Sequence, residues 1–204
     1  MVVDDFYPDP YQVRETALQG EYFESQRYVG LDCDQKLLHK ELDGAISRLV
    51  GQPVKGNMAE MGNHGRFRVT LGHHRNNEYQ AGIHVDSNDC VWAGLVCLAL
   101  DKDIPRDKAT GTHFYRHRQY DISRLPLNPA EEQAFGVSYS QMRRQVDEDG
   151  NDYDKWLFEF QLPLAFNRLL LFRPWCFHDN GENFGDRIDN GRLVHLLFFV
   201  LDND

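Results

Sequence analysis

His84 precedes Asp86 by two residues in the segment 82–87 (GIHVDS), which has the composition of a β-strand. Side chains two positions apart on a strand point to the same face, so this imidazole and this carboxylate are expected to project together. They would supply two of the three ligands of a two-histidine, one-carboxylate facial triad, the set that holds catalytic Fe(II) with open positions. Taken alone, the pair fits a surface loop equally well.

A third ligand would have to come from a distant part of the chain, and His178 is the best candidate. It follows the apolar run 169–172 and begins a loop rich in glycine and asparagine, 179–185. A strand end that faces an open mouth suits a catalytic metal, because such a metal needs vacant positions for its reactants. We therefore predict one metal site formed by His84, Asp86 and His178.

Arg192 stands fourteen residues after His178, at the start of the last apolar run, 192–200. Its apolar neighbours indicate burial, and a buried arginine requires an anionic partner. A carboxylate can meet this requirement through two parallel hydrogen bonds to the guanidinium. A bound carboxylic acid and an internal Asp or Glu would serve equally well. His195, in the same run, is interpreted as a core histidine whose ring is satisfied by a backbone carbonyl.

The elements that would position these residues are mostly strands. An Asp9-Pro10 start signal predicts a helix over 11–19, and apolar residues at helical spacing predict a second helix with Asp34 as its N-cap and Gly51 at its end. Beyond them the pattern favours a mixed helix and loop over 130–156 and strands over the segments 66–72, 80–86, 91–100, 112–116, 168–173 and 192–200. One mainly β domain over 1–204, a β-sandwich or jelly roll buttressed by N-terminal helices, is expected.

Composition excludes several classes of protein. The chain has 204 residues and a formal net charge of −10, so its surface should repel nucleic acid. No apolar run approaches the roughly 20 residues that cross a bilayer, and no secretory signal is recognisable at the start. The four cysteines form no CxxC pair and are expected to be free thiols. These features predict a cytoplasmic protein that binds neither nucleic acid nor membrane.

The order of the chemical residues resembles the 2-oxoglutarate/Fe(II)-dependent dioxygenase superfamily: an HxD pair, a long interval, a histidine at a strand end, and an arginine that opens the next strand. More narrowly, the chain resembles an uncharacterised bacterial branch with a prolyl-hydroxylase-like jelly roll. The segments 3–10 (VDDFYPDP), 111–118 (GTHFYRHR) and 167–193 carry this narrower resemblance. The arginine comes later after the histidine than is usual in the superfamily, and Val194 stands where Ser or Thr is common.

The resemblance implies a double-stranded β-helix with Fe(II) and 2-oxoglutarate as cofactors. His84, Asp86 and His178 would hold the iron, and Arg192 would bind the far carboxylate of 2-oxoglutarate. Molecular oxygen would then hydroxylate a small molecule or a peptide side chain, with formation of succinate and carbon dioxide. Related halogenases have a small residue at the position of Asp86, so a carboxylate there favours hydroxylation. The substrate itself and the oligomeric state, for which a homodimer is one option, are left open.

Several alternatives remain at this point. A cupin-like metal-binding jelly roll that does not use 2-oxoglutarate would pair Arg192 with an internal carboxylate, and a non-catalytic relative would bind its ligands without forming succinate. Arg168, Arg173 or Arg187 could bind the co-substrate in place of Arg192. The basic residues of segment 113–118 could line a substrate mouth or form the exposed face of a strand. The polar segment 141–154 could be a solvated helix or a lid that selects substrates.

Overall fold

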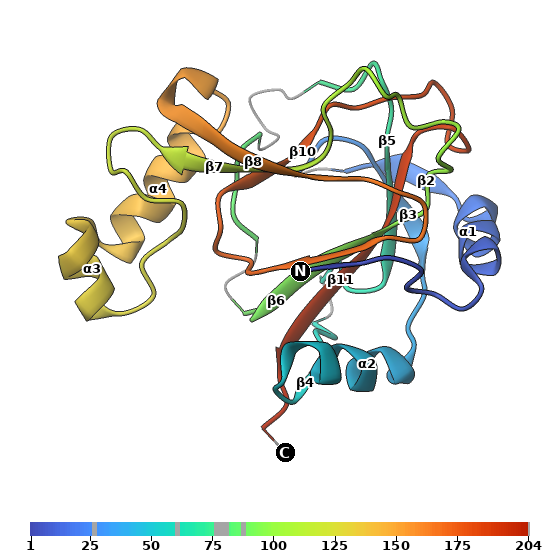
Figure 1. The fold of residues 1–204 in the computed structure, drawn as a ribbon, viewed down its shortest axis with the longest axis horizontal. Helices are drawn as coiled ribbons and strands as arrows, with labels where there is room; N and C mark the ends of the chain where they lie inside the picture. The colour runs from blue at the N-terminus through green and yellow to red at the C-terminus, as the bar shows by residue number, and fades with distance from the viewer. Residues whose placement is uncertain (26–27, 60–61, 76–81, 87–88, 204) are drawn as a thin grey trace.

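A computed structural model describes residues 1–203 apart from 26–27, 60–61, 76–81 and 87–88 (Figure 1). The described chain is mainly β, with two antiparallel sheets, neither of them closed, and four α-helices. The helices are α1 (Pro10–Gln19), α2 (Lys40–Val50), α3 (Pro129–Phe135) and α4 (Tyr139–Asp149), with a short 3-10 helix η1 (Tyr153–Lys155). The strands are β1 (Val2–Val3), β2 (Tyr22–Glu24), β3 (Leu31–Lys36), β4 (Val54–Gly56), β5 (Arg66–Thr70), β6 (Trp92–Cys97), β7 (Thr110–His117), β8 (Trp156–Pro163), β9 (Leu169–Phe172), β10 (His178–Gly181) and β11 (Arg192–Leu201).

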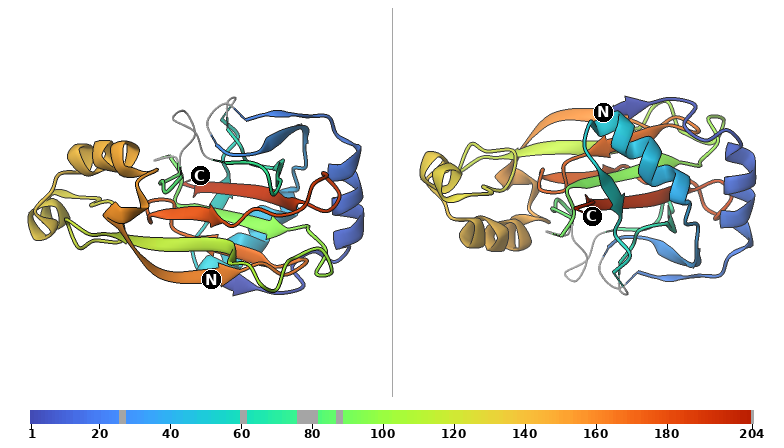
Figure 2. Two further views of the ribbon diagram at one scale, coloured as in Figure 1. Left: turned by 90° about the horizontal axis from the view of Figure 1, so that it is seen from above. Right: turned by 90° about the horizontal axis from the view of Figure 1, so that it is seen from below.

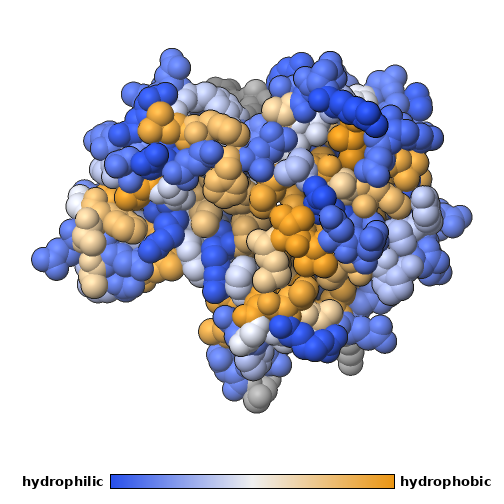
Figure 3. Space-filling view, in the orientation of Figure 1, coloured by the Kyte–Doolittle hydropathy of each residue, from blue (hydrophilic) through white to orange (hydrophobic). Residues whose placement is uncertain are grey.

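The larger sheet has eight strands in the order β1-β9-β6-β11-β5-β3-β2, and β4 pairs with the far end of β11. The smaller sheet has three strands in the order β10-β7-β8. Helices α3 and α4 lie beside the small sheet at one end of the molecule, and α1 lies at the other end (Figure 2). The space-filling view shows a notch between the end that carries α3 and α4 and the end that carries α2 (Figure 3).

The first helix forms where the sequence predicts it, and the second begins later than predicted. In α1 the Asp9 side chain accepts a hydrogen bond from the Gln12 amide (3.0 Å), and Pro10 occupies the first turn. Asp34 is not the N-cap of α2, because it lies inside β3 and its carboxylate accepts from the Glu21 amide (2.9 Å). Helix α2 starts at Lys40 and ends, as predicted, at Gly51, which adopts the left-handed conformation (φ 69°).

Five of the six predicted strand segments are confirmed by β5, β6, β7, β9 and β11. Of the sixth, residues 80–81 lie outside the described part, and in 82–86 only an isolated bridge at His84 is formed. Strand β8 was not predicted, because it is an edge strand whose residues 158–160 are all exposed and show no alternation. The mixed segment predicted over 130–156 contains α3, α4 and η1, and α4 buries Met142 and Val146.

Strand β11 divides the molecule into a core side and a cavity side. Its residues Leu193, Leu197 and Phe199 are fully buried in the main hydrophobic cluster, to which α1 and α2 contribute Val13, Ala17, Leu42 and Ile46. The alternate residues Arg192, Val194, Leu196 and Phe198 line a cavity on the other side. This period of two follows from the strand backbone and places Arg192 away from the helices.

His195 lies on the core side of β11, as predicted, and is fully buried. Its Nε2 is 3.1 Å from the Leu37 carbonyl oxygen, which can only accept, so Nε2 carries the proton. Its Nδ1 therefore accepts from the Tyr7 hydroxyl at 2.6 Å. Burial lowers the pKa of His195 to about 4, because the charged imidazolium is not solvated there.

This histidine predicts a loss of stability in mild acid. His195 binds a proton near pH 6.5 in the unfolded chain and only near pH 4 in the folded chain. The unfolding free energy therefore falls as the pH drops through that window, and this histidine contributes about 3 kcal/mol to the fall. Urea unfolding between pH 4.5 and 7.5 measures this slope. His195→Gln, which cannot be protonated, should reduce the slope, and the part that remains comes from other buried histidines such as His84, whereas His39→Gln at an exposed position should leave it unchanged. An unchanged slope in His195→Gln would contradict the assignment.

Candidate metal centre

The structure brings His84, Asp86 and His178 together, with one ligand atom of each lying within 4.8 Å of the others. The first and third are paired through their backbones, since each amide donates to the other's carbonyl oxygen at 2.9 and 3.0 Å. The Asp86 amide donates to the Pro174 carbonyl oxygen at 2.8 Å. This bond holds Asp86 beside the chain segment that leads to His178. The segment 82–86 therefore runs antiparallel to the approach to β10 and presents its two polar side chains to His178.

Both histidines have their proton placed on the nitrogen that faces away from the site. The Nδ1 of His84 is 2.7 Å from the Gly82 carbonyl oxygen, and the Nδ1 of His178 is 2.9 Å from the Cys176 carbonyl oxygen. A carbonyl oxygen only accepts, so each Nδ1 carries the hydrogen and each Nε2 keeps its lone pair. Backbone partners of this kind orient the histidine ligands of metal sites. The donor set thus fits a divalent transition metal.

The electrostatic surroundings favour the neutral form of His84. Burial, and after it the neighbouring His178, hold the pKa of His84 well below its usual value. The Nε2 of His178 is 3.5 Å from Oδ2 of Asp86. His84 is therefore held in the unprotonated form that metal ligation requires, close to a second imidazole and a carboxylate.

Helix α4 and the residues after it hold the segment that carries two of these ligands. The Ile83 amide donates to the Gly150 carbonyl oxygen (2.8 Å), and the Gly82 amide donates to the Asn151 side chain (2.9 Å). The helix is tied to the small sheet by a pair between His117 Nε2 and the Asp149 carboxylate at 3.0 Å. The position of His84 and Asp86 therefore depends on how α4 is packed.

A substitution at Gly150 should weaken metal binding without altering any ligand. A Cβ atom there would lie 2.5 Å from the Ile83 carbonyl oxygen, which is closer than van der Waals contact allows. Gly150→Ala should push segment 82–86 away from the helix and lower the affinity for Co(II) roughly tenfold in calorimetry. Gly44→Ala in α2, where a Cβ would meet only the end of Arg48 at 3.5 Å, serves as the control. Equal affinities in the two variants would refute this positioning role.

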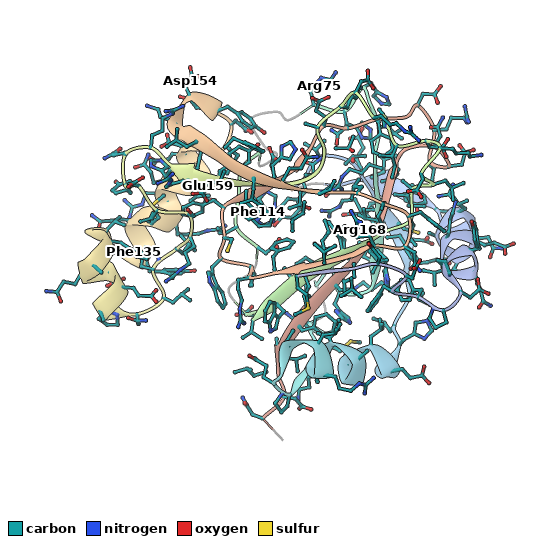
Figure 4. The ribbon with its side chains drawn as sticks, viewed as in Figure 1. Arg75, Phe114, Phe135, Asp154, Glu159 and Arg168 are labelled. Carbon is teal, nitrogen blue, oxygen red and sulfur yellow. The ribbon has the colours of Figure 1, made fainter. Side chains whose placement is uncertain are left out.

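The three candidate ligands and Arg192 line one cavity of about 780 Å³. A cavity of this size holds a co-substrate and part of a second small molecule. Phe172 and Phe114 pack beside His178, with ring centroids 4.7 and 6.1 Å away, so one wall of the site is aromatic. Phe114 lies near the centre of the molecule, as the stick view shows (Figure 4).

Arg192 is 3 % exposed and has no carboxylate within 4.0 Å among the residues that the structure describes. Within the same described set its Nε finds no hydrogen-bond partner. Burial lowers its pKa to about 10, although it stays charged at neutral pH. A buried, unpaired guanidinium is costly, and this one faces a cavity. The cavity end at Arg192 is therefore suited to an anion.

Two threonines that sequence reasoning missed also line the cavity. Thr70 is the cross-strand partner of Arg192, and Thr112 comes from β7. Both have a buried Oγ1 without a partner among the described residues. The Thr70 hydroxyl can donate to the same anion as the Arg192 guanidinium, which offsets the apolar Val194. The alternation of Arg66, Arg68 and Thr70 on one strand face was the signal that could have identified Thr70.

The other arginines considered for this role are engaged elsewhere. Arg168 pairs with Asp4 at the surface (Figure 4), and Arg187 pairs with Asp186 and Asp189. Arg173 lies over the Trp92 ring at 3.8 Å. Of these four arginines only Arg192 lines the cavity.

The basic residues of segment 113–118, which includes the end of β7, do not line the cavity: the two histidines are buried, whereas Arg116 is half-exposed and Arg118 is exposed. His113 is buried with its Nδ1 3.5 Å from the Asp179 carboxylate, and His117 is buried against Asp149. Arg116 pairs with Asp121 at 2.9 Å. Of the described residues of this strand, Thr112 is the one that lines the cavity.

Fold and site together define a mainly β protein with two antiparallel sheets and a candidate metal centre in a cavity between them. Residues 1–199 match the family model described as "Family of unknown function (DUF6445)", so the chain belongs to that family. A search of the curated proteins found no match. No helix within the described ranges is long and apolar enough to cross a membrane. All four cysteines carry free thiols, as predicted.

Proposed function

We propose that this protein is an Fe(II)/2-oxoglutarate-dependent dioxygenase that hydroxylates a small molecule or a peptide side chain. One observation carries the proposal: the candidate iron ligands His84, Asp86 and His178 share a cavity with a buried arginine that lacks a partner among the described residues. An iron site that shares a cavity with a carboxylate-binding arginine is the arrangement that a chelating dicarboxylic co-substrate requires.

The strand order supports a double-stranded β-helix as the finer description of the fold. Along the chain, β5, β6, β9 and β11 join the large sheet, where they are adjacent in the order β9-β6-β11-β5. The segments between them join the small sheet, where the His84 bridge extends the order β10-β7-β8 at its β10 edge. This interleaving of consecutive segments between two facing sheets is typical of a jelly roll.

Each residue then has a defined task. His84, Asp86 and His178 would hold Fe(II), which supplies oxygen activation coupled to the oxidative decarboxylation of 2-oxoglutarate. Arg192 would pair with the far carboxylate through two hydrogen bonds, with Thr70, its cross-strand partner, donating to the same group. In the overall reaction one atom of O₂ would enter the C–H bond of the substrate as a hydroxyl, and the other would enter succinate as carbon dioxide leaves. With a carboxylate at position 86, where related halogenases have a small residue, hydroxylation would be favoured over halogenation.

The surroundings of Arg192 favour this proposal over a cupin-like protein that does not use 2-oxoglutarate. Such a protein should pair this arginine with an internal carboxylate. Asp179, whose negative charge acts on Arg192, forms no ion pair with it within 4.0 Å and instead accepts from the Tyr115 and Tyr153 hydroxyls at 3.0 and 2.7 Å. A non-catalytic relative would bind both cofactors and release no product. A cytoplasmic location and O₂ as co-substrate belong to the same proposal.

One experiment tests the proposal against both alternatives. Fe(II) and 2-oxoglutarate are added to the protein without oxygen, and the weak visible charge-transfer band of the chelate is recorded. Oxygen is then admitted and succinate is measured. The proposal expects the band and succinate. The absence of a band in folded protein overturns it in favour of the cupin-like alternative, and a band without succinate overturns the catalytic part.

A further inference from the structure

We propose that the hydroxylated substrate is a small carboxylic acid whose carboxylate pairs with Arg66, at the end of the cavity opposite Arg192. Hydroxylation of this acid rests on the function proposed above, whereas the anion site itself rests on the geometry of β5 and its neighbours. Arg66, Arg68 and Thr70 alternate along this strand, and all three line the cavity.

Arg66 is too far from Arg192 to share its ligand. Thr70 is the cross-strand partner of Arg192, and Arg66 lies four residues further along the same strand face. At about 3.3 Å per residue, roughly 13 Å separate the two ends. A 2-oxoglutarate molecule that reaches from the metal site to Arg192 therefore leaves the Arg66 end free for a second molecule.

The guanidinium of Arg66 is only partly satisfied. Its Nη1 donates to the Cys33 carbonyl oxygen at 2.8 Å, and its Nε is buried without a partner among the described residues. No described carboxylate lies within 4.0 Å of it. An arginine in a cavity wall with unused donors on one edge is suited to a carboxylate, whose two oxygens match the guanidinium fork.

Neighbouring charges leave this end of the cavity with more positive than negative charge. Arg68 forms two hydrogen bonds to the Asp32 carboxylate at 2.6 and 3.1 Å, so that pair is neutral. Lys36 lies nearby, and its pKa is lowered by burial and then by the positive charge of Arg66. Glu24, on the exposed end of β2, is the one further carboxylate that the described lining has beside these two cations. In a chain of net charge −10, this local excess of positive charge favours an anion.

The wall between Arg66 and the metal centre is aromatic and suits the carbon skeleton of the substrate. Tyr28 lies 5.1 Å from the His84 ring, and the Arg68 guanidinium lies over Tyr28 at 5.0 Å. Phe23 lies beside Arg66, with its ring centroid 5.8 Å from the guanidinium carbon. A flat or short carbon chain could lie along these rings, with its carboxylate at Arg66 and a C–H bond near the metal centre.

Benzoate and its neutral analogue benzamide provide a matched pair of probes. Their binding to metal-free protein can be measured by ligand-observed NMR for the wild type and for Arg66→Gln, Arg66→Lys, Arg192→Gln and Arg144→Gln. Arg144 is an exposed arginine of α4 and serves as the control. We expect wild-type protein to prefer benzoate roughly tenfold, Arg66→Gln to lose the preference, and Arg66→Lys to keep part of it.

The outcomes separate this inference from the proposed function. Equal binding of the two probes to the wild type, or a preference that survives in Arg66→Gln, overturns the inference. A preference lost in Arg192→Gln and kept in Arg66→Gln places benzoate in the co-substrate site and also overturns it. Failure of the proposed function would be seen in a different experiment: the anaerobic Fe(II)–2-oxoglutarate band would be absent while the preference for benzoate remained. Thermal unfolding of each variant shows that the differences arise in folded protein.

Discussion

Asp86→Ala should abolish metal binding while leaving the fold intact. The change removes the one anionic ligand of the triad and leaves two neutral imidazoles, His84 and His178. Even substitutions outside the ligand set of a metal site cost about 10–100-fold in affinity, so loss of a ligand should cost more than about a hundredfold. Anaerobic calorimetry with Fe(II), or with Co(II) as a stable substitute, measures the affinity directly. Added metal should raise the unfolding temperature of the wild type and not that of the variant.

Asp89→Ala provides the matched control, because Asp89 lines the same cavity and carries the same charge without belonging to the triad. Its metal affinity should stay within a few-fold of the wild-type value. If the two alanine variants lost affinity equally, the effect would come from the general negative potential of the cavity. The assignment of Asp86 as a ligand would then be wrong.

Arg192→Met should remove 2-oxoglutarate binding and at the same time make the protein more stable. The guanidinium is buried without a carboxylate partner in the described structure, so an apolar side chain of similar length removes an unfavourable desolvation worth about 3 kcal/mol. Loss of a charge-assisted, two-bond pair should weaken the co-substrate by at least about a hundredfold. Titration of the anaerobic charge-transfer band gives the affinity, and urea unfolding gives the stability.

Arg187→Met is the control for this pair of effects, since Arg187 is exposed and lies outside the cavity. It should change neither 2-oxoglutarate affinity nor metal affinity. Two results would contradict the role given to Arg192: release of the metal in Arg192→Met, or a lower unfolding free energy than that of the wild type. Either would show that the arginine supports the structure and has no ligand of its own.

The sequence predicted correctly those helices and strands that are determined by neighbouring residues along the chain. Helix α1 follows from its Asp9-Pro10 start, strands β6, β9 and β11 follow from their apolar runs, and β5 follows from its alternation of polar and apolar residues. The predicted start of α2 was wrong because a tertiary contact determines where the helix begins. Strand β3 pairs with β2 and β5, so Asp34 is a strand residue and not a helix cap. The β8 strand was missed because an edge strand with exposed aromatic residues has no buried face to create alternation.

The three candidate metal ligands could be predicted from their order in the sequence, whereas the residues that surround and support them could not. Sequence spacing suggested that His84 and Asp86 share a face, and the structure brings them together with His178. The place of Thr70 and Thr112 in the cavity wall could not be predicted from the sequence. It depends on the register of β5 against β11 for Thr70 and on the position of the small sheet for Thr112. The support of segment 82–86 by α4 was equally hidden, because it depends on backbone contacts with Gly150 and Asn151, which carry no sequence pattern.

The alternation of β11 separates two kinds of selection along a single strand. Residues at 193, 197 and 199 are constrained by the hydrophobic cluster under the helices, whereas those at 192, 194, 196 and 198 are constrained by whatever occupies the cavity. Val194 and Leu196 also pack into a second hydrophobic cluster with Leu95 and Leu170, so they answer to folding as well as to the ligand. Phe198, which is only partly buried, is the cavity-side position of this strand where a change should affect ligand preference more than folding.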